Sequence, residues 1–171
     1  ESSAITDCGK IHAKKIVAAT HFPFINKHGS YFLKLYQHRS YVIALDNAQQ
    51  LNGMYVDENR KGNSFRNYKN FLLFEGGGHR TGKSGGNYNE LRTLAKRFYP
   101  YANEKFHWAA QDCMSLDDIP YIGKYSKHTP NFYVASGFNK WGMTGSMVSA
   151  IIISDLMTLG ANDFADVFNP S

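Results

Sequence analysis

The pattern of apolar and polar positions is most informative between residues 131 and 160. A short run of β-forming residues at 132–135 is followed by small residues, which predicts a buried strand that ends in a turn. Apolar residues then dominate from 144 to 159, which predicts a helix with Thr144 as its N-cap and Gly160 as its C-terminal stop. Because these apolar residues cover more than one stripe, we expect the helix to be buried on most sides.

This strand, turn and helix also suggest a binding site. A helix that begins directly after a turn leaves unpaired backbone N–H groups and the positive end of its dipole at one place. Such a place suits an anionic or electron-rich ligand. A plain connection without a ligand is the alternative, and the pattern alone does not choose between the two.

The rest of the chain predicts two further kinds of structure. Residues 14–20, KKIVAAT, have the composition of a buried strand in a parallel sheet. Residues 87–98 have helical spacing with Asn87 or Asn89 as N-cap, which predicts a surface helix, whereas residues 112–118 are predicted as a loop. An antiparallel sheet is predicted from short aromatic or β-branched runs at 31–35, 40–45, 54–56, 65–68 and 70–74.

Together these elements predict an α+β fold, an α/β remnant plus an antiparallel sheet. The pattern of predicted elements changes from one kind to the other at Pro23 and changes back at Pro130. The 171 residues are 43% hydrophobic and 15% aromatic, which is enough for a globular core.

The net charge is +5, but lysines and arginines are scattered, which argues against nucleic-acid binding. Histidines and two cysteines without ligand spacing predict no metal site, and the cysteine usage favours a cytoplasmic location. No apolar run is long enough to predict a membrane span.

One motif opens an alternative function. The segment GGHRTGKS, from Gly77 to Ser84, matches the G-x-x-x-x-G-K-[ST] phosphate-binding loop and follows a predicted strand. Gly85 and Gly86 come next, however, so a helix is not expected before Asn87. A glycine-rich hairpin loop is the simpler interpretation. A P-loop nucleotide-binding protein therefore stays an alternative, as does a non-enzymatic binding domain.

Three segments carry a family resemblance, and they occur in the family's order along nearly the whole chain. They are VAATHFPF at 17–24, HWAAQDCMSLDDIPYIG at 107–123 and FYVASGFNKWGMTGSMVSAIIISDLM at 132–157. Together they resemble the C-terminal part of FAD-dependent oxidoreductases of the D-amino-acid oxidase and glycine oxidase superfamily, in the branch often fused to a Rieske domain. The set is more specific than any one of its motifs.

The resemblance implies a fold of the FAD-linked reductase C-terminal (substrate) domain type, with part of the FAD-binding domain. Residues 1–22 and 131–171 would belong to the FAD-binding domain and residues 23–130 to the substrate domain. The turn and the start of the last helix would face the flavin ring and its ribityl chain, where a helix N-terminus would stabilise the anionic reduced flavin. The implied cofactor-binding residues are Ser136, Gly137, Phe138, Asn139, Lys140, Trp141, Gly142, Met143 and Thr144.

The resemblance also implies what the chain does not supply. No G-x-G-x-x-G dinucleotide-binding fingerprint occurs in the 171 residues, so we expect about half of an enzyme, without its N-terminal FAD-binding half. The whole protein would oxidise a small-molecule amine or amino acid by hydride transfer to FAD. This part alone would be inactive, would bind FAD poorly and could self-associate. Arg66 and His79 are candidate partners for the substrate, and no catalytic residue is assigned.

Overall fold

The computed structural model describes residues 2–25, 28–59 and 62–170. The chain divides into two compact units. Unit 1 comprises Glu1–Tyr36 and Asp112–Ser171, and unit 2 comprises Gln37–Gln111. These divisions fall at other positions than Pro23 and Pro130, and the assignment of segments to a FAD-binding and a substrate domain stays a prediction.

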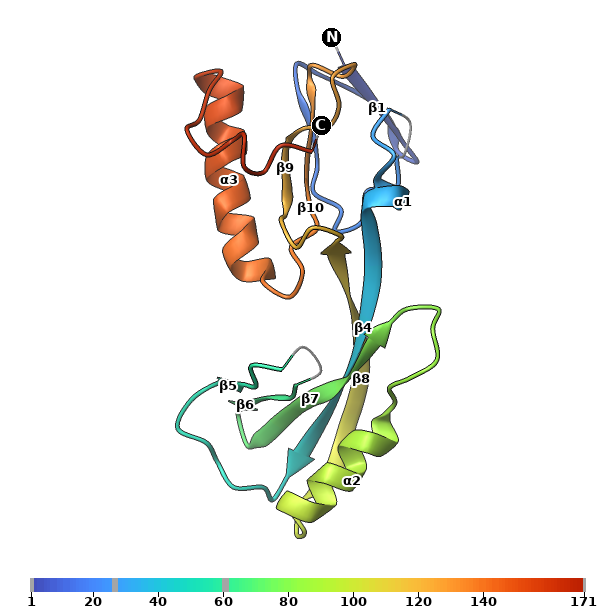
Figure 1. The fold of residues 1–171 in the computed structure, drawn as a ribbon, viewed down its shortest axis with the longest axis vertical. Helices are drawn as coiled ribbons and strands as arrows, with labels where there is room; N and C mark the ends of the chain where they lie inside the picture. The colour runs from blue at the N-terminus through green and yellow to red at the C-terminus, as the bar shows by residue number, and fades with distance from the viewer. Residues whose placement is uncertain (1, 26–27, 60–61, 171) are drawn as a thin grey trace. The chain divides into compact units, whose positions relative to one another are not determined.

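Unit 1 is built on a three-stranded sheet with the order β3-β10-β9. Its strands are β3 (Ile16–Ala18), β10 (Phe132–Ser136) and β9 (Tyr121–Lys124). The central strand β10 is parallel to β3 and antiparallel to β9. Helix α3 (Gly142–Thr158) packs beside this sheet, as Figure 1 shows. The core between them contains Ile122, Tyr133, Ala135, Ile152 and Ile153.

Two smaller elements complete unit 1. Strands β1 (Ser2–Thr6) and β2 (Gly9–Ala13) form an antiparallel hairpin. The short helix α1 (Tyr31–Lys34) replaces the first of the predicted strand runs, so that prediction is wrong. The reason lies outside the segment: the fully buried Tyr31 ring packs against Tyr125, 4.8 Å away between centroids, and its hydroxyl donates to the Tyr125 carbonyl.

Unit 2 contains a five-stranded sheet with the order β5-β6-β7-β4-β8. Its strands are β5 (Tyr55–Val56), β6 (Ser64–Tyr68), β7 (Phe71–Arg80), β4 (Leu35–Asp46) and β8 (Asn103–Ser115). The pairs β5–β6, β6–β7 and β7–β4 are antiparallel, which confirms the predicted type of sheet. Helix α2 (Tyr88–Phe98) covers one face (Figure 1) and buries Leu91 and Ala95 there.

The course of β7 removes the phosphate-loop alternative. The strand continues through the glycines to Arg80, and its partners on both sides are antiparallel. Lys83 and Ser84 lie in a turn, and α2 begins only at Tyr88. In a phosphate-binding loop the Lys-Ser pair opens the helix that holds the phosphates. Gly86, with a φ of 53°, takes a left-handed backbone that delays the helix here.

Two other predictions are corrected. Strand β8 extends to Ser115, so residues 112–115 are strand and not loop, and Cys113 is buried in the core of unit 1. Helix α3 is not buried on most sides, because Met143, Met147 and Ile151 are 87%, 64% and 57% exposed. No helix within the described ranges is long and apolar enough to cross a membrane.

Candidate functional site

The turn between β10 and α3 is shaped by two glycines. Gly137 has a φ of 71°, and a Cβ there would lie 3.1 Å from Leu35 Cδ2, so a side chain would be both strained and crowded. Gly145, in the first turns of α3, lies against the ring of Phe138, which a Cβ would approach to 2.9 Å. The absence of side chains at these positions therefore lets the turn pack closely against the start of the helix.

Asn139 anchors the turn to the end of β8. Its backbone N–H donates to the Cys113 carbonyl at 3.0 Å, and its Oδ1 accepts from the Ser115 N–H at 3.1 Å. Its Nδ2 donates to the Asp118 carbonyl at 3.1 Å. Asn139 itself has a φ of 55°, which asparagine tolerates better than most residues. These bonds account for Asn139 as a structural residue that holds the turn in one shape.

The start of α3 has unpaired backbone donors. Gly145 donates to the Trp141 carbonyl at 2.7 Å, which is the first helical hydrogen bond. The N–H groups of Gly142, Met143 and Thr144 precede it and have no acceptor within the helix. Trp141 is the N-cap but makes no side-chain capping bond, so Thr144 is not the N-cap that the sequence predicted. All four of these residues are exposed.

These features fit one side of a flavin. The unpaired N–H groups and the positive helix end suit its polar edge, while the exposed indole of Trp141 and the thioether of Met143 suit its ring. Apart from its chain neighbours and the adjacent helix backbone, no heavy atom of the described residues lies within 4 Å of the position of a Gly142 Cβ, so the approach there is open. Beside the turn runs a groove of about 410 Å³, lined by Val17, Ala19, His21, Ala135, Phe138, Ser146, Ser149, Ala150 and Ile153.

The other predicted residues of the turn differ in exposure. Ser136 is buried behind the turn, and its hydroxyl donates to the His21 carbonyl. Cys113 Sγ lies 3.4 Å from Ser136 Oγ, and burial raises the pKa of the Cys113 thiol, so this cysteine stays protonated. Lys140 is exposed, with its Nζ 3.9 Å from Asp112 Oδ2. Of the nine predicted residues, the structure brings Trp141 and the first three residues of α3 together at an open surface.

Arg66 lies in an aromatic groove on the sheet of unit 2. It is the Cα partner of Leu73 on β7, which in turn is the partner of Ala44 on β4, so these residues share one sheet face. The groove has a volume of about 560 Å³ and is lined by Ala44, Arg66, Tyr68, Phe71, Leu73, Phe106, His107 and Trp108. Among the described residues no carboxylate forms an ion pair with Arg66.

Sequence reasoning did not single out the aromatic walls of this groove. Phe106 and Trp108 are 58% and 41% exposed, although residues of this kind are usually buried. They alternate along β8, and this spacing of large aromatic residues was the one signal that could have identified them.

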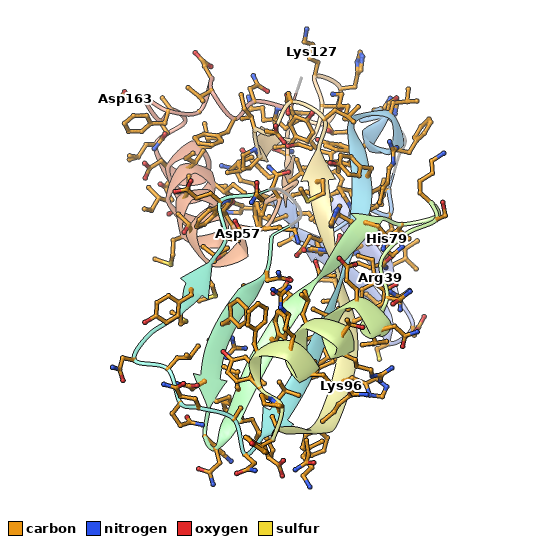
Figure 2. All side chains as sticks on the ribbon, turned by 60° about the horizontal axis from the view of Figure 1, so that its bottom comes forward. Arg39, Asp57, His79, Lys96, Lys127 and Asp163 are labelled. Carbon is orange, nitrogen blue, oxygen red and sulfur yellow. The ribbon has the colours of Figure 1, made fainter. Side chains whose placement is uncertain are left out.

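His79 lies on the opposite face of the same sheet. Its ring stacks on Tyr41 with 5.8 Å between centroids, and Tyr41 contacts Tyr88 of α2. Figure 2 shows His79 beside Arg39, its Cα partner on β4. The His79 Nδ1 is buried and has no hydrogen-bond partner among the described residues. Because Arg66 faces away from α2 and His79 faces toward it, one small ligand does not contact both.

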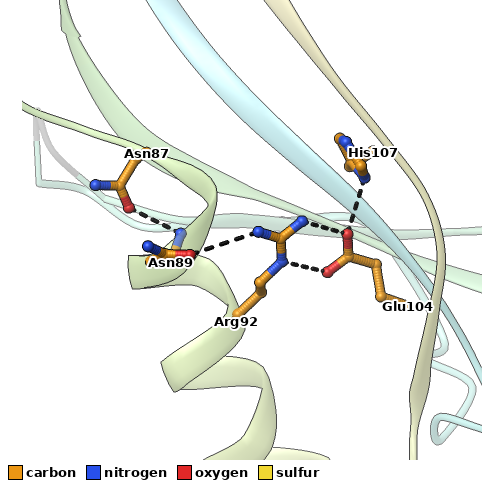
Figure 3. A network of polar contacts seen from close by, with 5 residues as sticks. All are labelled: Asn87, Asn89, Arg92, Glu104 and His107. Atoms are coloured by element: carbon orange, nitrogen blue, oxygen red, sulfur yellow. Dashed lines mark hydrogen bonds and ion pairs between the residues drawn. The ribbon is translucent and has the colours of Figure 1, made fainter.

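A polar network joins α2 to β8 (Figure 3). Arg92 donates from Nε and Nη2 to the two carboxylate oxygens of Glu104, each at 2.7 Å. His107 Nδ1 lies 2.9 Å from Glu104 Oε1. The hydrogen bond from Arg92 is the largest cause that lowers the pKa of Glu104. Within the described residues no group of three or more His, Cys, Asp or Glu side chains could hold a metal ion.

Comparison with known proteins identifies the family. The model of the FAD dependent oxidoreductase family, DAO, matches residues 2–156. This chain belongs to the DAO family. It is 35% identical over 169 residues to YhfW of Bacillus subtilis (strain 168), a protein provisionally named a Rieske 2Fe-2S iron-sulfur protein. The match covers 94% of this chain and 33% of YhfW.

Solved structures of other proteins share this DAO-family fold. Glycine oxidase from Geobacillus kaustophilus matches with a TM-score of 0.79 and 19% identity, covering 99% of this chain and 48% of the oxidase. L-proline dehydrogenase from P. horikoshii matches with a TM-score of 0.74 and 18% identity, covering 98% of this chain and 49% of the dehydrogenase. The predicted fold class is confirmed. The chain spans about a third of YhfW and about half of each enzyme.

Proposed function

We propose that this DAO-family chain is the C-terminal part of a flavoenzyme that oxidises an amine or amino acid by hydride transfer to FAD. The observation that carries the proposal is the open start of α3, where three N–H groups without helical acceptors adjoin an exposed tryptophan. Two structural relatives are named for glycine and L-proline, which supports a small amine or amino acid as substrate. The bound flavin would supply the hydride acceptor.

The protein's own contribution is orientation and charge placement. The N–H groups of Gly142, Met143 and Thr144 would donate to the flavin, and the helix dipole would stabilise negative charge there. The Asn139 bonds and the close packing at Gly137 hold these donors in place before the ligand arrives. The site is therefore preorganised by backbone rather than by a protein nucleophile.

Arg66 is the substrate-binding residue that the structure favours. Its guanidinium lies in a groove with aromatic walls and has no carboxylate partner among the described residues. A substrate carboxylate would form a charge-assisted, bidentate pair with it, while the aromatic side chains would contact apolar atoms. We propose His79 as a structural residue of the α2 face instead.

The remaining FAD contacts would come from outside these 171 residues. Each charge-assisted hydrogen bond contributes roughly 1.5–3 kcal/mol, so without donors to the pyrophosphate FAD binding would weaken by several powers of ten. We therefore propose that this chain alone neither holds FAD tightly nor oxidises an amine. Its partners would be a FAD-binding half and a small substrate, its compartment the cytoplasm, and its exposed apolar surface would favour self-association.

Gly142→Val tests the flavin site. In the protein that includes the FAD-binding half, this substitution should lower flavin occupancy, measured from the flavin absorbance bands, because the new side chain fills the open approach. The melting temperature should change little, since among the described residues the added Cβ meets no atom within 4 Å beyond its chain neighbours and the adjacent helix backbone. Ser154→Val, on the exposed far part of α3, is the matched control. Equal losses of flavin and of stability would contradict the proposal.

Three further measurements test the remaining proposals. FAD titrated into the 171-residue chain should not be quenched stoichiometrically, and tight quenching with amine-dependent peroxide formation would overturn the inactivity of this part. In the FAD-bound whole protein, anaerobic addition of amines or amino acids should bleach the flavin. A non-enzymatic binding domain predicts no bleaching by any of them. Arg66→Met should raise KM for a carboxylate substrate more than it changes kcat.

A further inference from the structure

A small pocket in unit 1 gathers four basic side chains around a buried tyrosine. It has a volume of about 170 Å³ and lies between residues 28–29, α1 and the turn after β9. The basic side chains are His28, Lys34, Lys127 and His128, and no aspartate or glutamate is among the described residues that line the pocket. None of these residues belongs to the turn before α3 or to the groove around Arg66.

Tyr125 is the unusual member of this pocket. It is 1% exposed, and its hydroxyl is buried without a hydrogen-bond partner among the described residues. Its ring packs against Tyr31 and Phe132, and its carbonyl accepts from the Tyr31 hydroxyl at 2.9 Å, so the residue is held firmly. Burial raises the pKa of Tyr125, which keeps the hydroxyl a donor at neutral pH. Buried hydroxyls normally have partners, so an acceptor from a ligand would satisfy this one.

The cationic groups come from three separate segments. Lys34 Nζ donates to the Pro170 carbonyl and lies 5.6 Å from the Tyr31 ring centroid, which leaves further N–H donors on the ammonium. The rings of His28 and His128 lie 5.7 Å apart between centroids. Lys127 is exposed, as Figure 2 shows. Basic side chains from three separate segments therefore line the pocket.

The backbone at 28–30 is specialised to bring His28 to this position. His28 and Ser30 have φ values of 67° and 50°, in the left-handed region that non-glycine residues rarely adopt. Between them, a Cβ on Gly29 would lie 2.3 Å from Tyr31 Cε2 and 2.8 Å from Tyr125 Cε1. Only glycine fits against these rings. Strained segments of this kind collect where a ligand is held.

We propose that this pocket binds a phosphate group, with the Tyr125 hydroxyl and the surrounding basic side chains as donors. Two lysines match the charge of a phosphate dianion, and donors supplied by separate segments suit a tetrahedral oxyanion better than a planar carboxylate. The volume admits a phosphate with a few waters, so any organic part of a phosphorylated ligand lies outside the pocket. This site is independent of the proposed oxidoreductase function.

Calorimetric titration of inorganic phosphate into the purified chain, at constant ionic strength, tests the proposal. We expect saturable binding of one phosphate per chain. Tyr125→Phe should weaken it about tenfold or more, because a hydrogen bond to a charged group is lost, without lowering the melting temperature. Lys127→Gln should weaken it severalfold. Lys10→Gln, which removes the same charge from the exposed strand β2, is the matched control and should leave binding unchanged.

The alternatives give different results. Absence of saturable binding, unchanged affinity in both Tyr125→Phe and Lys127→Gln, or equal affinity for acetate would overturn the proposal. An equal loss in Lys10→Gln would show a general charge effect and overturn it too. Phenyl phosphate identifies the source: tighter binding than inorganic phosphate indicates a phosphorylated organic ligand, and binding of inorganic phosphate only indicates the free ion. Either of these two results supports a phosphate site.

Discussion

The two long helices of this protein, α2 and α3, differ in the side chains at their first and last turns. At the start of α2, the Asn87 side chain accepts from the N–H groups of Asn89 and Glu90 at 2.8 and 3.2 Å. The first turn of α2 carries Glu90 and its last turn carries Lys96 and Arg97, all of which complement the helix dipole. Helix α3 has no side-chain cap, no acidic residue in its first turn and no basic residue in its last.

The faces of the two helices differ as well. Helix α2 is amphipathic and buries only the side that carries Leu91 and Ala95. Helix α3 is richer in apolar residues but also buries one side only, and Met143, Met147 and Ile151 form an exposed stripe at i, i+4 and i+8. In α2, which serves the fold, the N–H groups of the first turn and the helix dipole are thus satisfied by nearby residues of the chain. The helix proposed to serve the cofactor has unpaired donors and exposed apolar side chains.

The largest expected effect separates the two sides of α3. Ile152 is 2% exposed and packs against the sheet of unit 1, so Ile152→Ala should destabilise the fold by about 2–5 kcal/mol. Its neighbour Ile151 is 57% exposed, and Ile151→Ala should change stability by only about 0.5 kcal/mol. Urea unfolding of both variants measures the difference. Similar losses would show that α3 is covered on both sides.

The second prediction compares the two helix starts. Asn87→Ala removes the side-chain cap of α2 and should cost about 0.5–2 kcal/mol. Thr144→Ala removes the residue that resembled a cap in the sequence but makes no capping bond, so it should be within about 0.5 kcal/mol of wild type. Thermal unfolding followed by circular dichroism compares them, and a larger loss for Thr144→Ala would refute the assignment of caps.

A smaller, pH-dependent effect is expected at the attachment of α2. The Arg92 hydrogen bonds lower the folded pKa of Glu104, so this pair stabilises the fold above the unfolded carboxylate pKa of about 4.3. That contribution is lost as the pH falls through the lowered folded pKa. Denaturant unfolding from pH 7 to pH 3 should therefore show a steeper loss in wild type than in Glu104→Gln. Glu58→Gln, in an exposed loop, is the control and should retain the steep loss.

The last prediction involves no change in folding stability. Met147 is 64% exposed on α3, and Met147→Glu should leave the free energy of unfolding within about 0.5 kcal/mol of wild type. The substitution should reduce self-association of the isolated chain, because it interrupts the exposed apolar stripe. Sedimentation velocity over a range of concentrations measures this. Unchanged association would assign it to another surface, such as the aromatic groove around Arg66.

How much could be predicted depended on how local each signal is. Strand β10, the glycine-rich turn, α2 with its Asn87 cap, and Gly160 as a left-handed stop with a φ of 84° all follow from neighbouring residues. The phosphate-loop motif failed for a local reason too, because Gly85 and Gly86 cannot open a helix. The family resemblance was confirmed by the DAO family model, which matches residues 2–156.

By itself, then, the sequence determined the class of fold, the order of its main elements and the family. Only the tertiary structure decided which sides of these elements are covered. It placed Arg66 and His79 on opposite faces of the sheet and left one side of α3 exposed. It also made residues 31–34 helical, through the contact of Tyr31 with Tyr125. The physical reason is that backbone preference depends on near neighbours, whereas burial depends on residues that are distant in the chain and meet only after folding.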